Sequence, residues 1–170
     1  MNTGQINSLL KHVPSYKGAF ACNLLPAPRS LPAAYVINTA RLSAKDLRSR
    51  GVKKGLHWVA LVIKKNRHAV YFDSFGLPPL QRDIVNFIQR YCVTVKYSTQ
   101  QLQGPLTRVC GAYCVDFIDR FAGKGMTHRS YMSRFTQDTH VNDELVVKRV
   151  TCLSSARLRS PIMDLRTLLS

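Results

Sequence analysis

Acidic residues are the scarcest chemical class in this sequence of 170 residues. Nine Asp and Glu stand against 25 Lys and Arg, so the formal net charge at pH 7 is +16. A globular domain this basic is expected to bind polyanions, nucleic acid above all, in a salt-dependent way. A solvated charged surface that only keeps the protein soluble is the alternative explanation.

Long apolar runs, internal repeats and low-complexity tracts are also missing. The longest uncharged apolar runs, such as residues 58–63, have the length of a strand, so we expect no membrane association. The segment 1–5 has no basic start leading into an apolar core, so we expect no secretory signal. Five cysteines, an odd number at irregular spacing, argue against a disulfide scaffold and favour an intracellular, reduced protein.

Apolar residues make up 45% of the chain, which is typical of a globular protein, and the length fits one domain over residues 1–170. Apolar spacing predicts strands at 18–25, 33–37, 57–63, 69–72 and 92–97, and helices at 5–13, 78–91 and 110–121. After residue 125 the signal weakens: 144–152 fits a strand or a helix, and 157–170 fits a terminal helix. We therefore expect an α+β fold with a central sheet.

The third predicted helix opens on a cysteine, Cys110, just after the loop that Gly104-Pro105 marks. A thiol in the first turn of a helix lies near unpaired backbone N–H groups and the positive end of the dipole. Both favour the thiolate, which is the nucleophilic form. The alternative is that Cys110 is only the first core residue of an amphipathic helix.

A base and an acid for such a nucleophile stand at matching ends of the central hairpin. His57 begins one strand and Asp73 follows the other, so the two side chains meet at one end of the pair. An Asp there can orient the imidazole and stabilise its protonated form. Gln103, in the loop before Cys110, can donate to a developing oxyanion together with the Cys110 backbone N–H. Each residue alone fits a structural role; their combination favours cysteine catalysis.

These residues resemble the adenovirus-type cysteine protease family, adenain. The matching segments are LHW at 56–58, YFDSFG at 71–76, STQQLQGP at 98–105 and CGAYC at 110–114. The order His, acid, Gln, Cys matches, as do the Gln-Gly-Pro opening and the seven positions from Gln103 to Cys110. The similarity runs from about Ala33 to Phe121.

The resemblance implies a papain-like catalytic arrangement in permuted order, with the nucleophile at the start of a core helix. His57 would be the general base, Asp73 its orienting acid, Cys110 the nucleophile and Gln103 the oxyanion donor. The family cleaves viral structural precursor proteins during particle maturation, so we expect a monomer in the virion and at the infected-cell assembly site, in the nucleus or a cytoplasmic factory. Its adenoviral members are activated by DNA and by a short viral peptide tethered through a cysteine, which here is Cys92.

Asp73 departs from this pattern, because adenain usually carries Glu as its acid. Asp-Ser at 73–74 resembles instead the related ubiquitin-like-protein proteases. In those the Gln typically stands one position closer to the cysteine, so the spacing here favours adenain. Removal of ubiquitin-like modifiers is therefore an alternative function, and a basic DNA-binding core protein without catalysis is a third. We expect no metal, because Cys110 and Cys114 share a helix face but no Cys/His cluster completes a zinc set.

Overall fold

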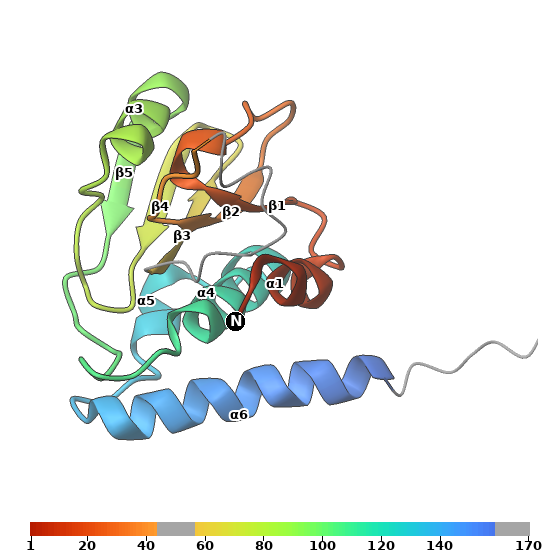
Figure 1. Ribbon diagram of the computed structural model, residues 1–170, viewed down its shortest axis with the longest axis vertical. Helices are drawn as coiled ribbons and strands as arrows, with labels where there is room; N and C mark the ends of the chain where they lie inside the picture. The colour runs from red at the N-terminus through yellow and green to blue at the C-terminus, as the bar shows by residue number, and fades with distance from the viewer. Residues whose placement is uncertain (44–56, 159–170) are drawn as a thin grey trace, which may run out of the picture.

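A five-stranded mixed sheet forms the centre of the fold, with helices on both faces (Figure 1). The computed structural model describes residues 1–43 and 57–158. Neighbouring strands follow chain order; the two outer pairs are parallel and the inner pairs antiparallel. The strands are β1 (Tyr16–Ala21), β2 (Ala33–Asn38), β3 (Trp58–Ile63), β4 (His68–Phe72) and β5 (Thr94–Tyr97). The expected α+β fold with a central mixed sheet is confirmed.

Five α-helices surround the sheet in the described part of the chain. They are α1 (Thr3–Leu10), α3 (Arg82–Tyr91), α4 (Cys110–Ile118), α5 (His128–Met132) and α6 (Thr139–Leu158). A short 3₁₀ turn, η1 (Cys22–Leu24), follows β1, and α4 continues into a wider π-helical turn, η2 (Asp119–Gly123). Among residues 1–43 and 57–158, no helix is both long and apolar enough to cross a membrane.

Alternating side chains of the inner strands build two separate cores. Along β3, Ala60 and Val62 face α4, whereas Leu61 and Ile63 face α3. All six residues of β3 are buried, which explains why its sequence is continuously apolar rather than alternating. The sheet is therefore a middle layer, with α3 on one side and α1, α4 and α5 on the other (Figure 1).

An aromatic stack fixes β4 against the helix that opens on Cys110. The rings of Phe72 and Phe117 lie parallel with centroids 4.5 Å apart, and Tyr131 packs edge-on against both. Such a pair contributes about 0.5–1.5 kcal/mol beyond the burial of its area. Because Asp73 directly follows Phe72, this stack also holds the acid near α4.

Two sequence predictions need correction. The strand predicted at 18–25 ends at Ala21 and gives way to η1. The helix predicted from residue 78 begins at Arg82, and the side chain of Leu80 is exposed rather than on the buried face. Both differences arise where an apolar residue falls just beyond the end of an element, since spacing alone does not define boundaries.

The uncertain region after residue 138 forms one long helix, α6. The Asp138 carboxylate accepts hydrogen bonds from the backbone N–H groups of His140 and Val141, which caps the helix start. Val146 and Val150 are buried at i, i+4 spacing on the face toward the core. The 144–152 segment is thus helical, while the terminal helix predicted at 157–170 lies almost entirely outside the described residues.

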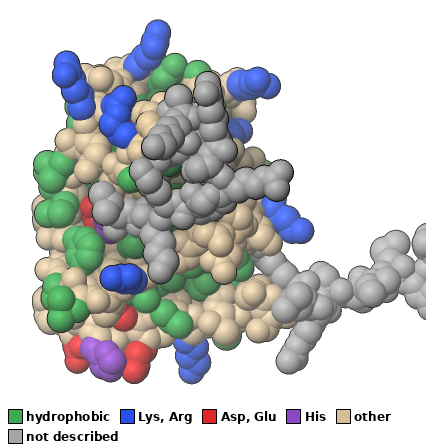
Figure 2. Space-filling model, viewed as in Figure 1, with side chains coloured by type: hydrophobic (Ala, Val, Ile, Leu, Met, Phe, Trp, Pro, Cys, Tyr) green, Lys and Arg blue, Asp and Glu red, His purple; other side chains and the backbone are tan. Residues whose placement is uncertain are grey.

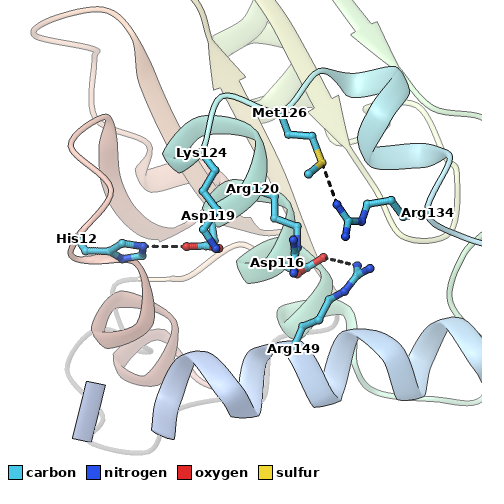
Figure 3. A network of polar contacts seen from close by, with 8 residues as sticks. All are labelled: His12, Asp116, Asp119, Arg120, Lys124, Met126, Arg134 and Arg149. Carbon is cyan, nitrogen blue, oxygen red and sulfur yellow. Dashed lines mark hydrogen bonds and ion pairs between the residues drawn. The ribbon is translucent and has the colours of Figure 1, made fainter. Parts of the chain in front are cut away.

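Ion pairs around two buried aspartates join the segment after α1 to η2, and α4 to η2 and α6 (Figure 3). Asp119 pairs with His12 at 2.8 Å and with Lys124 at 2.7 Å. Asp116 pairs with Arg120 at 2.8 Å and with Arg149 of α6 at 3.2 Å. The contact between His12 and Asp119 could not be predicted from local sequence patterns, because the two residues lie 107 positions apart.

Candidate active site

The β3–β4 hairpin brings His57 and Asp73 into contact. The two strands pair Ala60 with Phe72, so His57 and Asp73 flank the same end of the ladder. The imidazole Nε2 lies 2.9 Å from Asp73 Oδ1, with 16% of the His57 side chain and 4% of the Asp73 side chain exposed. This is the base-and-orienter geometry that cysteine catalysis requires.

A tight turn after β4 aims the Asp73 carboxylate at the imidazole. The Phe75 backbone N–H donates to Asp73 Oδ1 at 2.8 Å, and the Phe75 ring lies 5.0 Å from the imidazole, centroid to centroid. Gly76 has φ +71°, and a Cβ there would lie 2.8 Å from the backbone of Thr99 and Gln100. Only glycine fits this turn, because the conformation and the close backbone both exclude a side chain.

Cys110 occupies the first position of α4, where its thiol meets the other nitrogen of the imidazole. Since Asp73 takes Nε2, the nitrogen left for the sulfur is Nδ1. Burial alone raises the pKa of the Cys110 thiol, but a hydrogen bond with His57 and backbone hydrogen bonds from Trp58 and Gly111 lower that pKa below its ordinary value. The sulfur is therefore stabilised as a thiolate.

His57 completes an ion pair with that thiolate. Burial lowers the pKa of the imidazole, but hydrogen bonds with Asp73 and Cys110, together with their negative charges, outweigh burial and raise the pKa to about 9. A lowered thiol pKa and a raised imidazole pKa both favour the thiolate–imidazolium pair over the neutral thiol and imidazole. A nucleophile and a general acid are then present in the resting site.

Gln103 is buried in the loop before α4, with 1% of its surface exposed. Ser74 Oγ donates to its Oε1 at 2.7 Å, and its Nε2 donates to the Thr107 carbonyl at 2.8 Å. An amide nitrogen carries two protons, and the described residues supply a partner for one. The second proton is available to an oxygen of a bound substrate. No hydrogen bond joins Gln103 to Cys110 within the described part of the chain.

Ser74 is a site residue that sequence reasoning missed. It is 1% exposed, its hydroxyl fixes the Gln103 amide, and its carbonyl accepts the backbone N–H groups of Leu102 and Gln103. The sequence feature that could have identified Ser74 is its position directly after Asp73 in a turn. Consecutive side chains in a turn point toward different neighbours. The Asp-Ser pair therefore supports both the base and the loop of the candidate oxyanion donor.

Met1 and Trp58 line the approach to the first turn of α4. The Trp58 indole N–H donates to the Met1 carbonyl at 3.3 Å. A Cβ on Gly111 would lie 3.1 Å from Met1 Cβ and 3.4 Å from Trp58 Cδ1. Gly111 thus allows both residues to pack closely beside Cys110.

The remaining cysteines lie in different environments. Cys114, one turn after Cys110, is fully buried, and burial raises the pKa of its thiol well above the ordinary value. Cys92 directly follows α3, half-buried; burial raises the pKa of its thiol, and the nearby Arg67 opposes that change only partly. Within the described residues, no group of three or more His, Cys, Asp or Glu side chains could hold a metal ion.

The fold is shared with two solved structures from Chlamydia trachomatis. ChlaDub1 matches with a TM-score of 0.50 and 20% sequence identity, over 76% of this chain and 61% of that one. The effector protein Cdu1 bound to ubiquitin matches with a TM-score of 0.51 and 20% identity, over 76% and 63% of the two chains. At this identity the likeness concerns the fold alone.

In sequence, the chain is similar to adenovirus proteases. It is 30% identical over 101 residues to the protease of human adenovirus A serotype 12, covering 50% of this chain and 49% of that protein. It is 28% identical over 150 residues to the protease of human adenovirus B serotype 3, covering 79% and 61%. The chain spans about half the length of the first relative. No protein-family model matches. The resemblance drawn from the motifs is confirmed by these relatives.

Proposed function

We propose that this chain is a viral or virus-like cysteine endopeptidase. The observation that carries the proposal is the contact chain Asp73–His57–Cys110, which joins three separate segments around a thiol with a lowered pKa. A basic core protein with structural cysteines does not need an activated, half-exposed thiol beside a buried His–Asp pair. The resemblance to adenovirus proteases supports the same conclusion.

The geometry supports a two-step hydrolysis. The Cys110 thiolate attacks the substrate carbonyl carbon, and the negative charge moves to the carbonyl oxygen. The Gln103 amide and the Cys110 backbone N–H donate to that oxygen. The His57 imidazolium then protonates the leaving amine as the C–N bond breaks, which leaves a thioester. His57, now neutral, takes a proton from the water that hydrolyses the thioester.

Substitution of the nucleophile and the base tests this activity. Cys110→Ala and His57→Ala should abolish cleavage of a precursor protein while leaving the fold intact, whereas Cys152→Ala, at an exposed position on α6, should cleave like the wild type. An electrophilic peptide probe should label Cys110 and no other cysteine. Cleavage by pure Cys110→Ala protein would contradict the proposal, and an unreactive Cys110 would favour the non-catalytic alternative.

The proposed substrates are viral structural precursor proteins, cleaved in the virion and at the site of virus assembly. The similarity to adenovirus proteases supports this choice, together with the spacing from Gln103 to Cys110. Incubation with precursor proteins of the source virus should give discrete products that are missing when Cys110 is replaced.

Removal of a ubiquitin-like modifier is a second candidate function. Two observations favour it: the acid is Asp73, as in ubiquitin-like-protein proteases, and Cdu1, which has the same fold, binds ubiquitin. Incubation with ubiquitin and other modifier conjugates separates the two functions. Faster cleavage of conjugates than of viral precursors would favour the second.

DNA is the proposed polyanionic partner, as the charge of +16 suggests. Of the nine basic residues between 41 and 67, five lie outside the described residues: Lys45, Arg48, Arg50, Lys53 and Lys54. On the face drawn in Figure 2 the Lys and Arg side chains are spread out rather than gathered into one patch. Contact with phosphates, without sequence preference, fits such a distribution.

One pocket with basic side chains is the candidate site that we propose for this partner. It has a volume of about 380 Å³ and is lined by Lys64, Lys65 and His128, among others. His128 Nε2 is buried and has no hydrogen-bond partner among the described residues, and burial together with Lys96 and Lys64 lowers the pKa of its imidazole. Lys64→Glu with Lys65→Glu should weaken DNA binding and reduce its salt dependence. Unchanged binding would place the DNA elsewhere.

An activating peptide tethered at Cys92 is the last part of the proposal. The half-buried thiol lies at the junction of α3 and β5, beside the exposed Val93. Cys92→Ala should leave basal cleavage unchanged and abolish any gain that a cysteine-containing viral peptide produces under oxidising conditions. A gain that survives the substitution would exclude this tether.

A further inference from the structure

The first turn of α6 contacts the loop that carries Gln103. Asn142 and Asp143 project from this turn and are buried, with 0% and 6% of their surfaces exposed. Buried polar side chains normally stay only where hydrogen bonds compensate their loss of water. Each side chain has a partner in the Gln103 loop, and Asn142 also exchanges hydrogen bonds with Thr136.

The two side chains hold the peptide groups on either side of Gln103. Asn142 Nδ2 donates to the carbonyl of Leu102 at 3.3 Å, and the Gly104 backbone N–H donates to Asp143 Oδ2 at 3.2 Å. A Cβ on Gly104 would lie 3.2 Å from that carboxylate oxygen, so glycine permits the close approach.

The other oxygen of Asp143 reaches the nucleophile helix. Tyr113, three positions after Cys110, places its hydroxyl 2.9 Å from Asp143 Oδ1 and 3.0 Å from the Leu102 carbonyl. The hydroxyl has one proton, which the charged carboxylate attracts more strongly. The Leu102 carbonyl still accepts a hydrogen bond from the Asn142 amide. Asp143 therefore links the Gln103 loop to α4 through two short contacts.

We propose that Asp143, supported by Asn142, is a positioning residue that fixes the Gln103 amide relative to Cys110. This inference rests on the proposed function, since it concerns the oxyanion donor of that reaction. Among the described residues, the Asp143 carboxylate contacts the loop and Tyr113 of α4, but neither His57 nor Cys110. Loss of Asp143 should displace the oxyanion donor and leave the thiolate–imidazolium pair in place.

Two reactions of the same sulfur separate these effects. Iodoacetamide alkylates Cys110 by forming an S–C bond and releasing iodide, so its rate depends on the thiolate alone. An N-acetylglycine p-nitrophenyl ester forms a thioester and releases nitrophenolate, so its rate depends also on stabilisation of the oxyanion. Nitrophenolate leaves as an anion without taking up a proton. The acylation rate therefore does not depend on His57 acting as a general acid.

Asp143→Ala should lower the acylation rate about 10- to 100-fold, because small displacements of a catalytic group have effects of this size. The alkylation rate should stay within about twofold. Asp143→Asn should restore most of the acylation, since its amide oxygen can accept from Gly104 and its NH₂ can donate to Tyr113. Glu144→Ala is the matched control: it removes the next carboxylate on α6, which is exposed and pairs only with His140 in the described structure.

Equal loss of both rates in Asp143→Ala, or no loss of either, would overturn the proposal. If that variant fails to fold, Tyr113→Phe removes the link to α4, and Asn142→Ala removes the hydrogen bond to Leu102 together with those to Thr136. Each should lower acylation several-fold without changing alkylation; acylation unchanged in both would overturn the proposal as well. A wild-type Cys110 that is alkylated but never acylated would instead refute the proposed function, and this inference with it.

Discussion

Two buried aspartates each hold a histidine in this fold, at almost equal distances. Asp73 lies 2.9 Å from His57, and Asp119 lies 2.8 Å from His12. The first imidazole is 16% exposed and meets the sulfur of Cys110. The second is 42% exposed, and its carboxylate also binds Lys124 at 2.7 Å. The geometry of the His–Asp contact alone therefore does not define a catalytic site.

The groups around each pair make the difference. At the first pair, the cationic partner of Asp73 is His57, whose imidazole can gain or lose a proton. A proton can therefore move to and from the imidazole during a reaction of the sulfur. At the second, a lysine shares the carboxylate, and next to it Asp116 is bound by two arginines that remain charged at any ordinary pH (Figure 3). The first arrangement suits proton transfer; the second holds α1, η2 and α6 together.

The largest expected difference between the pairs is in turnover. Asp73→Asn should lower the cleavage rate by about 10³- to 10⁴-fold, as replacement of the orienting acid does in catalytic triads. Its free energy of unfolding should change little, because the Asn oxygen can still accept from Phe75. Asp119→Asn should cleave at the wild-type rate. Rate measurements on a common substrate check both, and equal losses would remove the distinction.

The second expected difference is in stability. Asp116→Ala should lower the free energy of unfolding by about 3–5 kcal/mol, because Arg120 and Arg149 lose their buried counter-charge. Urea denaturation of the variant and the wild type measures this effect. The folded fraction should keep wild-type alkylation at Cys110. A change below about 1 kcal/mol would show that the network contributes little to folding.

A third difference lies in the pH dependence of the cysteines. The lowered pKa of Cys110 should keep its alkylation by iodoacetamide fast well below the ordinary thiol pKa of about 8.5. Cleavage should fall at higher pH as His57, with its pKa of about 9, loses its proton. His57→Ala should slow alkylation at pH 6 about tenfold or more, and Cys114 should stay unlabelled in the folded protein. Rates that follow an ordinary thiol would contradict the ion pair.

The smallest expected effect concerns acid stability at the second pair. Burial raises the pKa of Asp119, but Lys124 and His12 outweigh burial and lower it. A carboxyl with a lowered folded-state pKa stabilises the fold above its unfolded pKa, near 3.9, and loses that contribution as the pH falls through the folded value. His12→Asn should reduce this contribution by about 1 kcal/mol or less. Unfolding curves between pH 2 and 6 measure it.

The sequence by itself predicted the centre of the fold and the catalytic candidates. Strand β3 is a continuous apolar run, and the hairpin that follows places His57 near Asp73 because paired strand ends must meet. The helix from Cys110 was visible in its apolar spacing. These are local patterns, in which residues close in the chain constrain one another directly.

Only the tertiary structure decided which distant groups complete the site and stabilise it. Asp143 reaches Gly104 across 39 positions, and Asp119 reaches His12 across 107. No periodicity relates such residues, because their contact depends on how α6 and α1 pack against α4. The pKa directions at Cys110 and His57 follow from the same packing: they depend on burial and on contacts between segments, which a linear pattern does not encode.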